Sequence, residues 1–225
     1  MPYVIGRPPK RVLALIATTV GMLVTASPAL ADGHHGNHQG DQVQQVAATP
    51  VSPDASCPAV TSTQLLSGLG DSAFYAPVSG GTFEGSTDGW SFRNASVVSG
   101  NEPWNVFAST DSNSLGIAAG GSATSPPFCL DYTLPSFRFF ANSADRGRHS
   151  GLNVAVRWTL SNGDSGQVPV RTLSAGSYDS WKLSPALPLG SALDAGQTVT
   201  VQFVFTAGTG SAWNIDDVLL DPYAK

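Results

Sequence analysis

The segment Leu152-Asn153-Val154-Ala155-Val156-Arg157-Trp158-Thr159-Leu160 places a large apolar side chain at every second position. A period of two is typical of a β-strand that buries one face against a core and exposes the other. The same alternation appears at 137–142, 167–171 and 199–206. Shorter candidate strands, with turn residues between them, lie at 82–84, 90–93, 95–98, 114–118 and 215–221.

About eight or nine such strands in one domain predict an all-β fold, a two-sheet antiparallel β-sandwich. The one stretch with a helical pattern is 62–69, which is long enough for one or two turns. Asp, Glu, Lys and Arg make up only 12% of the chain, while Gly is abundant. This composition favours a secreted β-protein over a helical one.

Residues 1–31 have the features of a signal peptide. Three basic residues precede an apolar run at 12–24, which is too short to span about 30 Å of hydrocarbon as a helix. Ala29-Leu30-Ala31 then provides a small-residue cleavage site. We therefore expect a secreted, extracellular protein without a transmembrane segment, although an uncleaved anchor is the alternative.

Residues 32–56 are rich in His, Gly and Gln and lack an apolar period, so we expect a disordered linker before a domain at 57–225. Cleavage after Ala31 would leave a free amine on Asp32 with His34 in third place. An amine, two backbone amides and an imidazole form the tetragonal nitrogen set that selects Cu(II) or Ni(II). The alternative is a solvated polar tail without bound metal.

Cys57 and Cys129 are the two cysteines of the chain. In an oxidising compartment they predict one disulfide that connects the start of the domain to its middle. Three of the 11 basic residues lie in the expected signal peptide, which leaves 8 against 16 acidic residues in the mature chain. This balance makes nucleic acid an unsuitable partner, because phosphate binding needs clustered Lys and Arg.

Two motifs stand near the ends of the strand-forming region: Phe83-Glu84-Gly85-Ser86-Thr87-Asp88-Gly89-Trp90 and Trp213-Asn214-Ile215-Asp216-Asp217-Val218-Leu219-Leu220. With the strand count, they resemble the first and last strands of a galactose-binding-like jelly roll, the fold of many secreted carbohydrate-binding modules. The resemblance covers 83–223 and implies a domain that binds a polysaccharide or another glycan without catalysis. The segment around Cys57 is not part of the usual pattern and is interpreted as an added cap.

Jelly rolls of this type often hold a structural calcium ion between the first and last strands. The resemblance therefore implies Glu84 as one ligand and Asp216 or Asp217 as the other, and carboxylate oxygens suit calcium. Regular alternation from Trp213 would also direct Asp217 inward, where a carboxylate needs a partner or a metal. The alternative is that these carboxylates cap a turn or pair with an arginine.

Arg138, Arg157, Arg171 and Gln202 all fall on the non-core phase of their strands. If these strands are neighbours in one sheet, the four side chains form a polar patch that can hydrogen-bond sugar hydroxyls or carboxylates. Trp104 and Trp181 lie in loop-like surroundings, where an exposed ring could stack on a sugar. We predict ligand binding by these six residues; the alternative is a solvated sheet face with ordinary buried aromatics.

The sequence contains no Gly-x-Ser-x-Gly elbow, no His-Glu-x-x-His pair and no phosphate-binding loop. We therefore expect a non-catalytic, monomeric carbohydrate-binding module. One alternative is an extracellular protein-interaction or adhesion domain with no sugar specificity. A third hypothesis is a hydrolase or lyase with dispersed carboxylates, because fold alone does not decide function.

Overall fold

The computed structural model describes residues 57–144, 150–189 and 198–221. The expected signal peptide, the linker at 32–56 and the candidate metal ligand His34 lie outside these ranges. The described residues form antiparallel strands, as the alternation predicts, and no α-helix occurs among them. Within these ranges, no helix has the length and apolarity needed to span a membrane.

The described residues contain eleven strands and two single 3₁₀ turns. They are η1 (Ser67–Leu69), β1 (Ala76–Pro77), β2 (Ser91–Ser99), β3 (Asn113–Thr124), β4 (Phe128–Leu130), β5 (Ser136–Ser143), β6 (Gly151–Thr159), β7 (Ser165–Ser174), η2 (Ala175–Ser177), β8 (Lys182–Leu183), β9 (Leu187–Pro188), β10 (Val199–Ala207) and β11 (Trp213–Asp221).

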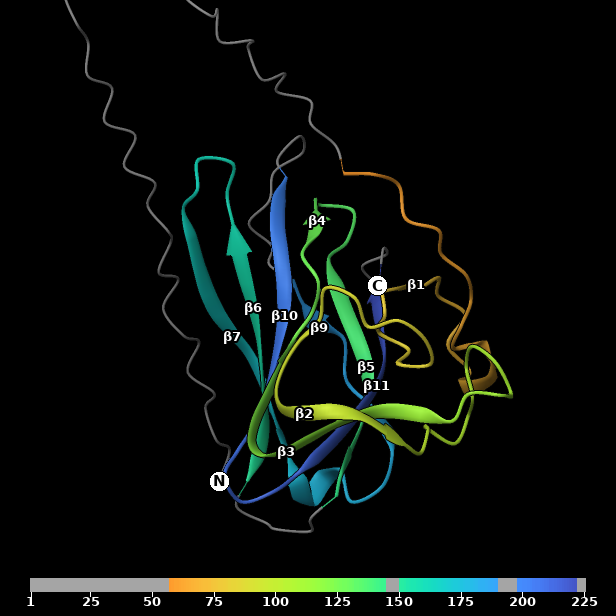
Figure 1. Ribbon diagram of the computed structural model, residues 1–225. Helices are drawn as coiled ribbons and strands as arrows, with labels where there is room; N and C mark the ends of the chain where they lie inside the picture. Colours follow the sequence, from red (N-terminus) through yellow and green to blue (C-terminus); the bar gives the residue numbers. More distant parts are fainter. Residues whose placement is uncertain (1–56, 145–149, 190–197, 222–225) are drawn as a thin grey trace, which may run out of the picture. The chain divides into compact units, whose positions relative to one another are not determined.

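The strands form one curled sheet that folds into two layers joined by β3 (Figure 1). The first layer has the order β7-β6-β10-β3, with β4 also paired to β10. The second layer has the order β3-β11-β5-β8, with β1 beside β11 and β9 beside β5. Residues 122–124 of β3 pair with β10, whereas residues 115–117 pair with β11. β3 therefore passes from one layer into the other.

The corner in β3 depends on two glycines. Gly120 has a φ of 72°, a left-handed value that favours glycine. At Gly121, an added Cβ would lie 2.5 Å from the carbonyl oxygen of Asn94 and 2.8 Å from that of Ala118. β2 has a bulge at the same place, since its register with β3 shifts between Arg93 and Ala95. The two strands therefore bend together, and only glycine at position 121 allows their close approach.

The core lies between the two layers and is centred on stacked phenylalanines. Phe137 of β5 stacks on Phe203 of β10, with ring centroids 3.9 Å apart. Phe139 meets Phe205 edge to face at 5.0 Å. All four rings are fully buried, so each alternating strand contributes its apolar face as predicted.

The N-terminal part of the domain covers the outer face of the second layer. Its Leu66 and Tyr75 pack with Phe140 and Leu219 in a small second core. The predicted disulfide between Cys57 and Cys129 is confirmed, with a Cα–Cα distance of 5.5 Å. It ties the beginning of this segment to β4.

Three local predictions are wrong. The segment Thr82–Glu84 forms turns instead of a strand, and Phe83 there has a φ of 55°. The strands expected at 90–93 and 95–98 are one strand, β2, because the bulge at Asn94 interrupts the alternation without ending the pairing. The helix expected at 62–69 is reduced to the 3₁₀ turn Ser67–Leu69, since the segment follows the outer face of the sheet and Thr63 pairs with Tyr75.

Replacing Gly121 by Ala should destabilise the fold, because the new methyl group would overlap main-chain oxygens that belong to paired strands. Overpacking typically costs about 1–3 kcal/mol, and we expect the upper part of that range in chemical denaturation. Gly68→Ala is the matched control, since no heavy atom lies within 4 Å of its Cβ position. Equal free energies of unfolding for the two variants would contradict the role given to Gly121.

Candidate functional site

The outer face of the first layer carries polar side chains in rows that cross the strands. Gln202 of β10 lies directly opposite Arg157 of β6, and Arg157 lies opposite Gln167 of β7. We call these three residues the amide–guanidinium row. The prediction that Arg157 and Gln202 share one face is therefore confirmed. Gln167, which completes the row, was not among the predicted ligand-binding residues.

A second polar row crosses the same face four residues further along the strands. It joins Thr206 of β10 to Asn153 of β6 and Thr172 of β7. Thr172 donates a hydrogen bond of 2.8 Å to the Asn153 side-chain oxygen. At about 3.3 Å per residue, the two rows stand about 13 Å apart.

An apolar strip lies between the two polar rows. Val204, Ala155 and Pro169 are cross-strand neighbours there. Val204 is 7% exposed and Ala155 8% exposed, although both point away from the core between the layers. The strip is thus a narrow apolar band between two polar rows, and Pro169 is its exposed member.

Arg157 is an exposed cation whose side chain makes no ion pair or hydrogen bond with any residue in the described ranges. Gln202 is held in place, because its side-chain amide donates a 2.9 Å hydrogen bond to the Ser125 carbonyl. That bond leaves the Gln202 side-chain oxygen as an acceptor. The row therefore combines a fixed amide with a free guanidinium, which has donors in a planar fork.

Arg171 does not share this face, so the prediction of one patch containing all three arginines is wrong. The register between β6 and β7 shifts next to Val154, which leaves Val170 as an extra residue. Arg171 is consequently opposite Val154, a core residue. A bulge inverts the alternation that follows it, and sequence alternation alone contains no sign of it.

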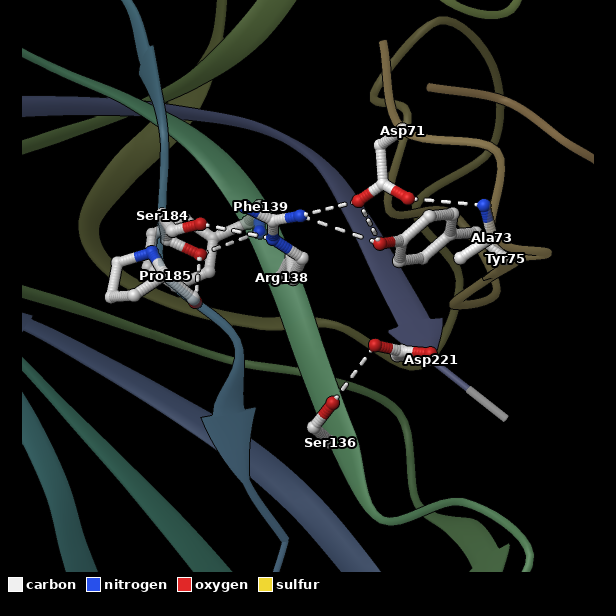
Figure 2. Close-up of polar contacts among 9 residues, drawn as sticks. All are labelled: Asp71, Ala73, Tyr75, Ser136, Arg138, Phe139, Ser184, Pro185 and Asp221. Atoms are coloured by element: carbon white, nitrogen blue, oxygen red, sulfur yellow. Dashed lines mark hydrogen bonds and ion pairs between the residues drawn. The ribbon is translucent and has the colours of Figure 1, made fainter. Parts of the chain in front are cut away.

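Arg138 belongs to the second layer and has structural partners (Figure 2). Its guanidinium forms a 2.9 Å ion pair with Asp71 and donates to the Tyr75 hydroxyl at 3.3 Å and the Ser184 carbonyl at 3.1 Å. Tyr75 also donates to Asp71 at 2.8 Å. These contacts fasten the N-terminal segment to β5, and they place Arg138 on the opposite side of the core from Arg157 and Gln202.

Trp104 and Trp181 also lie on the outer face of the second layer. The Trp104 ring stacks on Phe140 of β5, with centroids 5.3 Å apart, and is 44% exposed. Trp181 packs against the small second core that includes Phe140. The six predicted ligand-binding residues are thus divided between two faces of the domain, with Arg171 at an edge.

Three carboxylates are buried where β11 meets the loop after β2. Glu102 is 1% exposed, Asp216 0% and Asp217 2%. Glu102 accepts hydrogen bonds from the backbone N–H groups of Trp104 and Val106, and its own N–H donates to Asp216 at 3.4 Å. Glu102 was missed by the sequence reasoning, since its partners are backbone groups of its own loop.

Asp217 is the least satisfied member of this carboxylate cluster. β11 has a bulge between Asp216 and Leu219, so Val218 takes the core position that regular alternation assigns to Asp217. Asp217 has a φ of 46°, and its Oδ2 atom has no hydrogen-bond partner among the described residues. A buried, unpartnered carboxylate oxygen requires a proton or a cation.

Glu84 has a well-defined structural role next to this cluster. Its carboxylate accepts hydrogen bonds from the backbone N–H groups of Ser112 and Asn113 and from the Asn113 side chain. It thereby caps the start of β3. Within the described ranges, no group of three His, Cys, Asp or Glu side chains is already arranged to hold a metal ion, so metal binding by Glu84, Asp216 and Asp217 stays a prediction.

Burial raises the pKa of Asp216 to about 8 and that of Asp217 to about 9. The neighbouring negative charges add to this effect, chiefly Asp216 acting on Asp217. Without a cation, both groups therefore hold protons at neutral pH. Both side chains are closed to solvent. The groups with raised pKa values therefore lie in the protein interior and not in a cleft that a substrate could enter.

No protein-family model matches the chain, and no curated protein matches it. Among solved structures, the chain is similar to the CBM22-1 xylan-binding domain of Paenibacillus barcinonensis Xyn10C, at 14% identity over 73% of this chain and 97% of that one, with a TM-score of 0.45. It is also similar to TmCBM61 in complex with β-1,4-galactotriose, at 17% identity over 64% and 95% of the two chains, with a TM-score of 0.39.

A third similar structure is a family 22 xylan-binding domain, at 20% identity over 62% of this chain and 90% of that one, with a TM-score of 0.40. All three are carbohydrate-binding modules.

The buried aspartates should make stability depend on pH when a chelator removes divalent cations. Above the ordinary Asp pKa of 3.8, the unfolded chain releases both protons, whereas the native state keeps them up to about pH 8 and 9. The free energy of unfolding should therefore fall as pH rises from about 5 to 7, by about 1.4 kcal/mol per pH unit for each group. Asp217→Asn should remove about half of this slope.

The matched control is Asp88→Asn, because Asp88 is exposed. Urea denaturation at several pH values measures the slope for each variant. A slope in Asp217→Asn equal to that of the wild type would show that Asp217 is not held protonated.

Proposed function

We propose that this chain is a secreted, non-catalytic module that binds carbohydrate on the outer face of its first layer. The observation that supports this most directly is the apolar strip of Val204, Ala155 and Pro169 between two rows of polar side chains. The disulfide favours an oxidising, extracellular location. The carboxylates with raised pKa values are buried, which speaks against an acid–base role on a substrate.

The chemistry of the face suits a sugar chain. A pyranose ring has apolar C–H faces and a rim of hydroxyl groups, so it pairs an apolar floor with polar margins. Arg157 presents guanidinium donors and Gln167 presents an amide, neither of which bonds another side chain in the described part of the chain, and Gln202 presents its side-chain oxygen. Pockets for small ligands typically combine an apolar lining with a few placed polar groups. A chain lying along the strip would cross β7, β6 and β10 in turn.

We also propose that a calcium ion binds at the carboxylate cluster, with Asp217 and Asp216 as ligands and Glu84 next to them. The unpartnered, buried Oδ2 atom of Asp217 supports this, because calcium prefers hard oxygen ligands. When bound, the ion would neutralise charge that is otherwise held by protons. The role of such a site is structural, since Glu102 ties the cluster to the loop at 101–106.

Calcium should raise the melting temperature of the mature protein, because an ion that binds only the native state stabilises it by mass action, by about 2.7 kcal/mol at a hundredfold excess over Kd. Scanning calorimetry in EDTA and in calcium measures the shift. Asp217→Asn should abolish it and Asp88→Asn should retain it. If Asp217→Asn shows the full calcium shift, the ion does not bind through this residue.

Arg157→Ala should weaken binding to the recognised polysaccharide by about 10- to 100-fold, because a hydrogen bond to a charged group contributes about 1.5–3 kcal/mol. Arg171→Ala is the matched control, because it removes an exposed arginine from the neighbouring strand, and this arginine does not belong to the face that carries Arg157. Affinity electrophoresis in gels that contain xylan, galactan or hydroxyethylcellulose provides the measurement.

Equal retardation of the two variants would overturn the assigned face. If the wild type binds none of the polysaccharides tested, the alternative of a protein-interaction or adhesion domain gains support instead.

A further inference from the structure

A hollow of about 460 Å³ lies on the outer face of the second layer, on the opposite side of the core from the amide–guanidinium row. Its floor includes Gly116 of β3 and Asn214 of β11, with Ser96 of β2 next to them. None of the residues that line it is charged. The chemistry of the lining therefore suits a neutral ligand.

The hollow exists because position 116 lacks a side chain. Ser96, Gly116 and Asn214 are successive cross-strand neighbours. A Cβ at Gly116 would lie 3.0 Å from a methyl group of Val98 and 3.5 Å from the Asn214 side-chain oxygen. Even an alanine would therefore fill the floor between these two side chains.

Two amides are cross-strand neighbours on this face, and one of them, Asn214, lines the hollow. Asn214 lies directly opposite Asn142 of β5, and both are half-buried on the outer face. Neither side chain makes a hydrogen bond with another residue in the described ranges. Together they offer two carbonyl oxygens and two NH₂ groups to a ligand.

Aromatic side chains lie further along the same outer face. Asn142 and Phe140 lie on the same face of β5, two residues apart, which is about 7 Å along a strand. Trp104 stacks on Phe140 and keeps 44% of its surface exposed. Trp181, just before β8, packs against the same small core. A partly exposed indole on the same outer face as paired amides can hold the apolar face of a sugar while the amides bind its hydroxyls.

We propose that Asn142, Asn214 and Trp104, with the hollow over Gly116, form a second binding site for a neutral pyranose residue. Its ligand class rests on the proposed carbohydrate-binding function, but its position and residues are independent of the amide–guanidinium row. Because the two sites lie on opposite outer faces, one molecule would hold two glycan chains at once. Such bivalency raises the avidity for a polysaccharide network without new contacts.

The test uses the mature chain and three probes, namely xylohexaose, cellohexaose and β-1,4-galactotriose, in isothermal titration calorimetry. The wild type should bind two equivalents of the recognised probe, and Arg157→Ala should reduce this to one. In the Arg157→Ala background, Asn214→Ala and Trp104→Ala should each weaken the remaining site at least tenfold. Trp104→Phe should retain most of the binding, because it keeps a stacking ring.

The outcomes separate the two proposals. Complete loss of binding in Arg157→Ala would overturn the second site and leave the proposed function standing. Unchanged affinity in Asn214→Ala and Trp104→Ala, with circular dichroism showing an intact fold, would also overturn it. Binding that is lost in Trp104→Ala but kept in Arg157→Ala would support the second site and contradict the first. A wild type that binds none of the three probes would overturn both.

Discussion

The close approach of β2 and β3 at Gly121 is the constraint on which the two-layer arrangement depends. A side chain at this position would occupy the space of the Asn94 and Ala118 carbonyl oxygens, so the strands can bend together only over a glycine. Beyond the corner, β3 pairs with β10 and completes the first layer. Before the corner, it pairs with β11 and completes the second. Both proposed binding surfaces therefore rest on strands that this corner holds in place.

Buried carboxyl groups organise a second part of the structure, where β11 meets the loop after β2. Glu102 directs its carboxylate at the backbone N–H groups of its own loop, and this loop carries Trp104 over Phe140. The same glutamate adjoins Asp216 through its own N–H group. The local order of the loop is thus linked to the charge state of the carboxylate cluster, because protonation or a bound cation decides how strongly these carboxylates repel one another.

The fold class and several strands could be predicted because alternation reports directly which face of a strand is buried. This holds for β6, β5 and β10, and it also placed Arg157 and Gln202 correctly on one face. Alternation does not report bulges. It therefore assigned Arg171 to the wrong face of β7, and it assigned Asp217 to a core position that Val218 occupies. Nor does it report which strands are neighbours, so Arg138 of β5 was grouped with residues of the first layer, although β5 belongs to the second. Glu102 has no periodic signal at all; the apolar Trp104, Val106 and Phe107 that follow it were the one hint of a loop packed around it.

The proposed sugar-binding surface crosses β7, β6 and β10 on the first layer. The most direct test is to map amide chemical-shift changes in the ¹⁵N-labelled mature protein during titration with the oligosaccharide that it binds, in the Asn214→Ala background, which isolates the first layer. The largest changes should fall on Asn153, Ala155, Arg157, Gln167, Gln202 and Val204. Changes confined to other residues, with these six unmoved at saturation, would contradict it.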